Sequence, residues 1–173
     1  MLTLAGCKRA VRVHDLDGHS LDPLAGGRQV RAYVFVSTDC PVCNRYVPEI
    51  RALRARYAAR GVSVRLVYPD ATVTAGAVRE HLRSYGLSPD ALLDPRHALV
   101  HRAGVTITPE AAVFVGTQRV YRGRIDDRWA GFGRMRPAAT RHELADALDA
   151  VLAGRTPPVA GGAAVGCAIA DPL

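Results

Sequence analysis

The clearest pattern along the chain is a series of short apolar runs that alternate with amphipathic segments. The runs are rich in β-branched and aromatic residues and have the length of strands buried in a sheet. They cover residues 30–36, 62–68, 91–93 and 112–115. A turn at residues 116–118 predicts that residues 119–125 pair with the last run as a hairpin, and a shorter strand and turn is expected within residues 11–21.

Helical spacing of apolar residues fills the segments between these runs. Residues 42–60 place Val47, Ile50, Leu53 and Tyr57 on one face. Pro48 is expected to kink this helix. Further helical segments are expected over residues 75–85 and 96–103. A last helix follows Thr140, which has the spacing of a capping box with Glu143, whereas residues 129–137 are predicted to form a Gly-rich loop.

Length and composition indicate a single domain with a short additional segment at each end. The chain has 173 residues, of which 49% are hydrophobic and 23% charged, with a mean hydropathy of +0.02. These values are typical of a globular protein that buries a core. No apolar run approaches the ~18 residues that a membrane-spanning helix needs, so an integral membrane protein is excluded.

The net charge of +7 would ordinarily suggest an anionic partner. Here 22 of the 23 basic residues are arginines, Lys8 being the exception, and they are spread along the chain without a dense run. We therefore interpret the charge as compositional bias and predict no nucleic-acid binding.

Four cysteines are too few for the disulfide framework of a small secreted scaffold, but two of them form a C-x-x-C pair. Cys40 and Cys43 lie where an apolar strand passes into a helix. A cysteine at a helix N-terminus faces unpaired backbone amides, which stabilise its thiolate. Cys40 is therefore the candidate nucleophile, and Cys43, one helical turn later, is the candidate resolving thiol. A metal site is the alternative, although structural zinc usually needs four ligands.

The first residues of the chain carry information about the cellular compartment of the protein. Leu4-Ala5-Gly6-Cys7 resembles a bacterial lipobox, in which the cysteine becomes lipidated after cleavage. Only six residues precede Cys7, fewer than a signal peptide needs. Residues 1–9 are interpreted as a leader with a lipobox remnant, which favours the cell envelope with anchoring through Cys7; a cytoplasmic protein is the alternative.

The order of elements around the C-x-x-C pair resembles the thioredoxin-like superfamily, in its redoxin, AhpC/TSA and TlpA-like branch. The resemblance rests on residues 34–43, on Thr108-Pro109 before an apolar strand, and on the last helix, and it covers residues 10–154. It implies a three-layer α/β/α fold with a central mixed sheet and the strand–helix insertion of this branch.

The resemblance also implies a function. Pro109 matches a cis-proline that faces the C-x-x-C pair, and Thr108 would offer backbone groups to a bound peptide. The expected activity is thiol–disulfide exchange by Cys40 and Cys43 with protein substrates, without an organic cofactor and with an upstream redox partner. Thiol peroxidase activity, as in the AhpC/TSA group, is an alternative. The peroxiredoxin motif fails, because Tyr33 stands where its proline is needed.

Some positions depart from the thioredoxin pattern. Asp39 replaces the aromatic residue before the first cysteine, and its charge is expected to raise the pKa of Cys40. Val34 stands in place of the buried acid that accepts a proton from the second thiol. Glu110 is the nearest substitute as a proton relay. Asp126 and Asp127 are expected to neutralise Arg122 and Arg124.

Residues 155–173 read as an extended flexible tail rich in Pro, Gly and Ala, with a small apolar island around Cys167. The island is able to fold back on the domain. Cys167 is then an accessory redox thiol, a soft metal ligand beside Cys40, or a small packed residue. The second of these leaves copper binding or delivery through the thiols as an alternative function.

Overall fold

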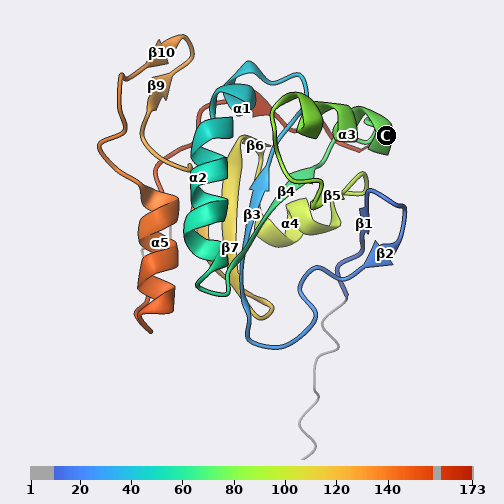
Figure 1. Cartoon of the computed structure of the whole chain (residues 1–173), viewed down its shortest axis with the longest axis horizontal. Helices are drawn as coiled ribbons and strands as arrows, with labels where there is room; N and C mark the ends of the chain where they lie inside the picture. Colours follow the sequence, from blue (N-terminus) through green and yellow to red (C-terminus); the bar gives the residue numbers. More distant parts are fainter. Residues whose placement is uncertain (1–9, 158–160, 173) are drawn as a thin grey trace, which may run out of the picture.

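A seven-stranded mixed sheet forms the centre of the protein, as seen in a computed structural model that describes residues 10–157 and 161–172 (Figure 1). The strand order is β2-β1-β5-β4-β3-β7-β8. The strands are β1 (Val13–Asp15), β2 (Ser20–Leu21), β3 (Val30–Phe35), β4 (Ser63–Tyr68), β5 (Ala91–Leu93), β7 (Glu110–Val115) and β8 (Gln118–Gly123). β3, β4 and β5 are parallel, and the outer pairs are antiparallel.

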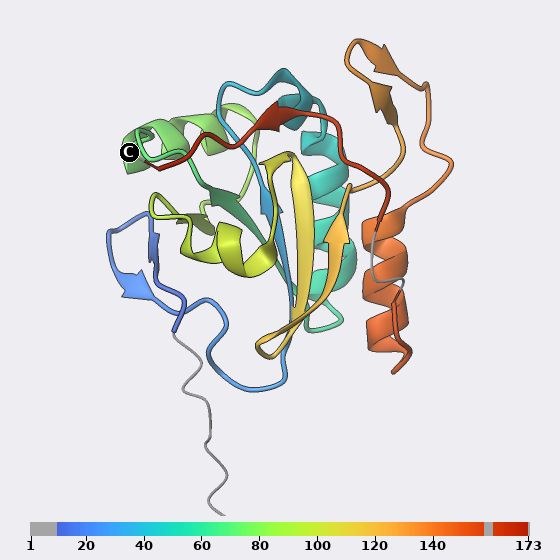
Figure 2. The same ribbon diagram turned by 180° about the vertical axis from the view of Figure 1, so that it is seen from behind.

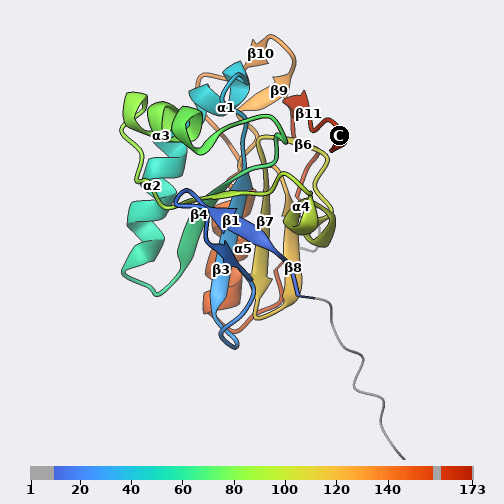
Figure 3. The ribbon, with the colours of Figure 1, turned by 90° about the vertical axis from the view of Figure 1, so that its right-hand side faces the viewer.

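Alternation along the central strands gives the sheet two apolar faces. On β3, Val34 joins one buried cluster, whereas Tyr33 and Phe35 join the other. The first cluster is covered by α1 (Pro41–Arg45), α2 (Val47–Ala58), α3 (Ala75–Ser84) and α5 (Glu143–Leu152), and the second by α4 (Ala98–Ala103). Figure 3 shows α2 and α4 on opposite sides of the sheet. The predicted three-layer fold is confirmed.

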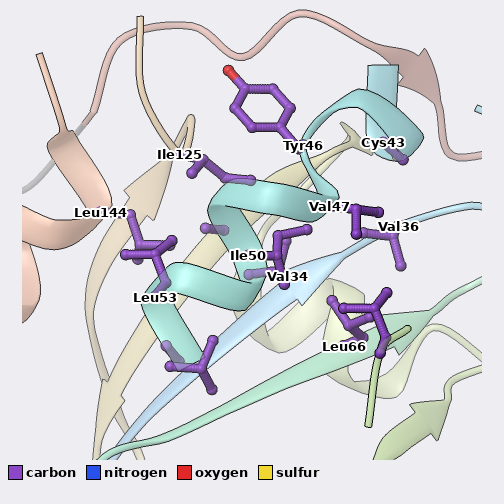
Figure 4. Close-up of a cluster of buried hydrophobic side chains, with 14 of the residues drawn as sticks. Val34, Val36, Cys43, Tyr46, Val47, Ile50, Leu53, Leu66, Ile125 and Leu144 are labelled. Atoms are coloured by element: carbon purple, nitrogen blue, oxygen red, sulfur yellow. The ribbon is translucent and has the colours of Figure 1, made fainter. Parts of the chain in front are cut away.

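The helix after the C-x-x-C pair is interrupted one turn after it begins. The sequence predicts one kinked helix, but α1 ends before Tyr46 and α2 starts immediately after it. Pro48 sits in the first turn of α2, where a missing N–H costs no hydrogen bond. Ile50 and Leu53 then pack on the sheet beside Val34 (Figure 4).

The segment between β8 and α5 differs from the prediction. Residues 129–137 contain a short hairpin of β9 (Trp129–Gly131) and β10 (Arg134–Met135) rather than only a loop. The predicted capping box is wrong, because His142 is the N-cap of α5 and makes no side-chain cap bond. The Thr140 hydroxyl donates instead to Asp127 Oδ2 at 2.6 Å.

The expected pairing of the two aspartates with Arg122 and Arg124 is also wrong. Arg124 pairs with Glu143 at 2.5 Å, and Arg122 pairs with Glu110 at 3.2 Å. Asp126 Oδ1 instead accepts a 2.6 Å hydrogen bond from the Tyr46 hydroxyl, and Asp127 accepts backbone N–H groups of residues 140 and 141. Both aspartates are buried, and their hydrogen bonds fix the loop before α5: Asp126 ties it to Tyr46, and Asp127 binds the backbone of residues 140 and 141.

The C-terminal segment folds back on the domain. β11 (Cys167–Ala168) pairs antiparallel with β6 (Ile107–Thr108), which precedes β7. Figure 2 shows this segment crossing the end of the sheet near α1. The leader, with Cys7, lies outside the described residues. Within residues 10–157 and 161–172, none of the helices is long and apolar enough to cross a membrane.

Candidate active site

The C-x-x-C pair lies at the end of β3, where the chain turns into α1. Cys40 is the N-cap residue, with extended backbone angles, and Pro41 begins the helix. Proline favours this position because its fixed φ suits a first turn. Cys40 and Cys43 are both buried, and Cys43 is one helical turn further along, so α1 presents two thiols at one end of the sheet.

A third thiol meets this pair from the far end of the sequence. Cys167 Sγ on β11 lies 2.9 Å from Cys40 Sγ and acts as a hydrogen-bond donor to it. Cys40 Sγ is also 3.3 Å from the carbonyl oxygen of Thr108, to which it donates when it carries its proton. The sequence leaves Cys167 with three possible roles, as a redox thiol, a metal ligand or a packed residue. The structure places it against the candidate nucleophile.

These contacts stabilise the thiolate of Cys40. Its pKa is lowered to about 5, first by a hydrogen bond from the Cys43 thiol and then, against the effect of burial, by one from the Cys167 thiol. Backbone N–H groups of the first helical turn add to the effect. Asp39, which is expected to raise this pKa, is not among the main causes of the net lowering, and its carboxylate accepts from the Thr38 hydroxyl at 3.1 Å.

The two partner thiols keep their protons. Burial raises the pKa of Cys43 far above its usual range, and the neighbouring Cys40 raises it further. The pKa of Cys167 is raised to about 11, first because its thiol donates to Cys40. One thiolate and two thiols are therefore present at neutral pH, a distribution suited to nucleophilic attack by Cys40.

The Thr108–Pro109 peptide bond is cis, as the resemblance implies. Thr108 is buried, and its carbonyl faces Cys40 while its Cα pairs with that of Cys167 across the β6–β11 ladder. The residue expected to meet a substrate peptide thus meets the protein's own tail.

Glu110 is placed away from the thiols. It is buried, and its Oε2 accepts from the Thr106 N–H at 2.9 Å while Oε1 pairs with Arg122 at 3.2 Å. Alternation along β7 puts Glu110 on the same side as Ala112 and Phe114, opposite the face covered by α1. Both carboxylate oxygens are therefore engaged on the other face of the sheet.

A polar network beside α1 was missed by the sequence analysis. Asn44, next to Cys43, donates from Nδ2 to the Thr38 carbonyl at 3.3 Å, so its Oδ1 accepts from His81 Nε2 at 2.8 Å. His81 Nδ1 then accepts from the Tyr68 hydroxyl at 2.9 Å. Burial lowers the pKa of His81, consistent with a neutral ring. The only sequence signal for this role is the position of His81 on the face of the α3 helix that is turned toward the domain.

The three cysteine sulfurs do not form a compact ligand set. Among the residues that the structure describes, groups of three metal-ligating atoms within 4.8 Å of one another occur at Asp15, Asp17 and His19 and at Glu49, Asp126 and His142, neither of which includes a cysteine. Three sulfurs around one Cu(I) ion would need to converge more closely.

Comparison with known proteins decides the family. The family model named Redoxin matches residues 11–124, which include both C-x-x-C cysteines and the cis-proline. The chain belongs to the redoxin family. Among curated protein sequences, none matches this redoxin.

Solved structures share the fold of this redoxin over most of its length. A hypothetical protein from Sinorhizobium meliloti is 24% identical, with a TM-score of 0.74, and the alignment covers 91% of this chain and 88% of that one. An uncharacterized protein from Geobacillus kaustophilus is 22% identical, with a TM-score of 0.74 and coverage of 91% and 86%.

A secreted disulfide oxidoreductase from Mycobacterium tuberculosis, homologous to E. coli DsbE, is also similar in fold to this redoxin. It is 17% identical, with a TM-score of 0.56, and the alignment covers 83% of this chain and 94% of that one. These likenesses show that the redoxin has a thioredoxin-like fold.

Proposed function

We propose that this redoxin is a thiol–disulfide oxidoreductase that uses Cys40 and Cys43 as its redox pair. The observation that carries the proposal is a stabilised Cys40 thiolate at the start of α1, opposite a cis-proline and one helical turn from a protonated thiol. A low-pKa nucleophile and a high-pKa resolving thiol are the two groups that disulfide exchange needs.

The reductive direction proceeds in two steps. The Cys40 thiolate attacks one sulfur of a substrate disulfide, which forms a mixed disulfide and releases the other substrate sulfur as a thiolate. Cys43 then loses its proton to that thiolate and attacks Cys40 Sγ, which forms the Cys40–Cys43 disulfide and releases the second substrate sulfur as a thiolate. A dithiol partner must return two electrons; in the oxidative direction the same steps run in reverse.

Loss of the Cys43 proton requires an acceptor, because Val34 occupies the position of the acid used in thioredoxins. The released substrate thiolate meets this need in the scheme above. Glu110, with both oxygens bound elsewhere, is not assigned the role.

Trapping separates the roles of the two cysteines. In the double variant Cys43→Ser/Cys167→Ser the second step is blocked and no neighbouring thiol remains at Cys40, so incubation with a peptide disulfide should accumulate a Cys40–peptide mixed disulfide that mass spectrometry locates. Cys40→Ser, the matched control, should form none and should lose turnover. A peptide trapped on Cys43 or Cys167 in the Cys40→Ser control would contradict the assignment of Cys40 as the nucleophile.

The same variants test the alternative functions. A metal-delivery protein would hold Cu(I) through Cys40 and Cys43 against a weak chelator under reducing conditions, and a peroxidase would consume peroxide through Cys40. We expect neither activity to match disulfide exchange, because Cys43 keeps its proton whereas a Cu(I) site at the pair needs two thiolates, and because Tyr33 stands where the peroxiredoxin motif needs a proline.

We place the protein outside the cytoplasm of a bacterial cell, with protein thiols and disulfides as substrates. The lipobox-like segment ending at Cys7 supports this location, as does the fold shared with a secreted oxidoreductase. Metabolic labelling with a fatty acid tests anchoring: incorporation that Cys7→Ser abolishes is expected, and an unlabelled protein would contradict it.

A further inference from the structure

The C-terminal segment is attached to the domain at two places. At the first, Gly161 N donates to the Arg122 carbonyl at 3.1 Å, and Arg124 N donates to the Gly162 carbonyl at 3.3 Å. At the second, β11 pairs with β6, Cys167 standing opposite Thr108, and Ile169 N donates to the Thr106 carbonyl at 3.0 Å. Residues 161–169 therefore cross from β8 to the cis-proline loop in a fixed register.

Gly166 makes this register possible. A Cβ atom at this position would overlap the Thr108 carbonyl oxygen and would lie 3.0 Å from Pro109 Cδ. The obstacle is backbone, which cannot turn aside as a flexible side chain would. Only glycine lets the strand approach this closely, and the approach is what brings the next residue, Cys167, to Cys40.

The attached segment covers the nucleophile without being deeply buried itself. Cys40 is 1% exposed, whereas Gly166 is the one buried residue of 161–172. A cavity of about 330 Å³ lies between residues 168–171 and the loop at 69–72. The segment is held by the short ladder, by the hydrogen bonds at residues 161 and 162, and by partial packing of Cys167 and Ile169 on the two apolar clusters, so displacing it opens less packing than displacing a buried strand.

We propose that residues 161–172 act as an internal substrate and that Cys167 is a third redox thiol which exchanges disulfides with Cys40. The inference rests on the proposed function. Cys167 lies on an added strand beside the cis-proline, its sulfur 2.9 Å from the nucleophile, in the arrangement that a bound peptide cysteine requires. An external substrate must therefore displace this segment to reach Cys40.

The exchange is balanced without any other reactant. Starting from the Cys40–Cys43 disulfide, the Cys167 thiolate attacks Cys40 Sγ, the Cys40–Cys167 bond forms, and Cys43 leaves and takes up the proton that Cys167 lost. No net oxidation occurs. The product has its tail covalently fixed over the peptide-binding edge, and reduction by a dithiol partner releases both the tail and the nucleophile.

The test traps the second disulfide. Full-length Cys43→Ser is oxidised with glutathione disulfide, which accepts two electrons to give two glutathione molecules, and Cys7, Cys40 and Cys167 are mapped by mass spectrometry. We expect an intramolecular Cys40–Cys167 bond. Glutathionylated Cys40 with free Cys167, or bonds to Cys7 only, would overturn the inference.

Gly166→Val in the Cys43→Ser background is the matched control, since it keeps all three remaining thiols. Detaching the segment should lower the rate of Cys40–Cys167 bond formation by at least about tenfold, because alignment is lost while the tether remains. Circular dichroism establishes that this variant is folded; Gly161→Val, whose Cβ would overlap the buried Tyr121 side chain at the first attachment, is the second variant. An unchanged rate in folded variants would overturn the role of the attached segment.

Cys167→Ser keeps this outcome separate from that of the proposed function. If this variant forms the Cys40–Cys43 disulfide while Cys43→Ser never forms the Cys40–Cys167 bond, the internal-substrate inference fails and the oxidoreductase stands. If Cys167→Ser forms no Cys40–Cys43 disulfide at any glutathione ratio, the proposed function fails as well.

Discussion

Three cysteine residues divide the chemistry of the site between them. Cys40 is the thiolate, because Cys43 and Cys167 both donate to it and the first helical turn adds backbone N–H groups. Cys43 holds its proton first because it is buried, and Cys167 first because its thiol donates to Cys40; the negative charge of Cys40 opposes a second charge at both. The ionisation of each sulfur thus depends on the other two.

This dependence predicts the titration of Cys40. Thiolate absorbance of the reduced protein should show a transition near pH 5. Cys167→Ala removes one donor and should move the transition to higher pH, whereas Cys167→Ser keeps a hydroxyl donor and should move it less. A transition that stays in place in Cys167→Ala would show that the contact between the two sulfurs does not stabilise the thiolate.

At the scale of elements, the interrupted helix α1–α2 positions the redox pair. α2 is anchored by Ile50 and Leu53 against β3, and the Tyr46 hydroxyl at the break donates to buried Asp126. The first turn, which carries Cys40 and Cys43, is thereby held to the sheet on one side and to the loop after β8 on the other.

Removing part of this anchor should destabilise the fold. Ile50 is 1% exposed, and Ile50→Ala deletes buried methyl groups and leaves a cavity, so we expect a loss of about 2–5 kcal/mol in the free energy of unfolding. Arg51→Ala on the exposed side of the same helix is the matched control, with an expected change within about 0.5 kcal/mol. Equal losses in urea denaturation would contradict the assigned packing of α2.

The sequence predicts elements whose pattern is local. Apolar runs predict β3, β4 and β7, and helical spacing predicts α2. These predictions succeed because the positions of apolar residues along a segment determine which of its faces is buried. The capping box at Thr140 fails since Asp127, distant from α5 in sequence, supplies a stronger acceptor. The break at Tyr46 was missed for the same reason: its hydroxyl is held by Asp126, a contact across the fold.

The residues of the candidate site also fall into two groups: those that a local pattern or the resemblance predicts, and those that depend on contacts across the fold. Cys40 and Cys43 are predicted because a C-x-x-C pair and its helix are contiguous, and Pro109 because the resemblance supplies its partner. The 2.9 Å approach of Cys167 depends on the path of a segment that runs from β8 to β6, which no local pattern encodes. His81 is missed because its partners, Asn44 and Tyr68, come from two other elements.

At the scale of the whole molecule, the thiolate links redox state to stability. The folded protein lowers the pKa of Cys40 from 9.0 to about 5, so ionisation stabilises the reduced fold fully above pH 9. This contribution is lost progressively as the pH falls toward 5. The Cys40–Cys43 disulfide has no such group to titrate.

The melting temperature of the reduced protein should therefore fall more steeply than that of the oxidised protein between pH 9 and pH 5. Cys40→Ser, which has no thiolate, should behave like the oxidised protein. Parallel pH profiles for reduced and oxidised wild type would mean that the folded state does not stabilise the Cys40 thiolate.

The central claim, that Cys40 and Cys43 are a reversible redox pair, is tested most directly by an anaerobic titration of the full chain in glutathione buffers, with all four cysteines mapped at each potential. We predict a two-electron transition at the C-x-x-C pair, on the oxidising side of the about −270 mV of thioredoxin because the reduced state is stabilised. Cys167 should appear only as an exchange partner of Cys40. If no disulfide of Cys40 forms at any potential, the protein is not a thiol–disulfide oxidoreductase.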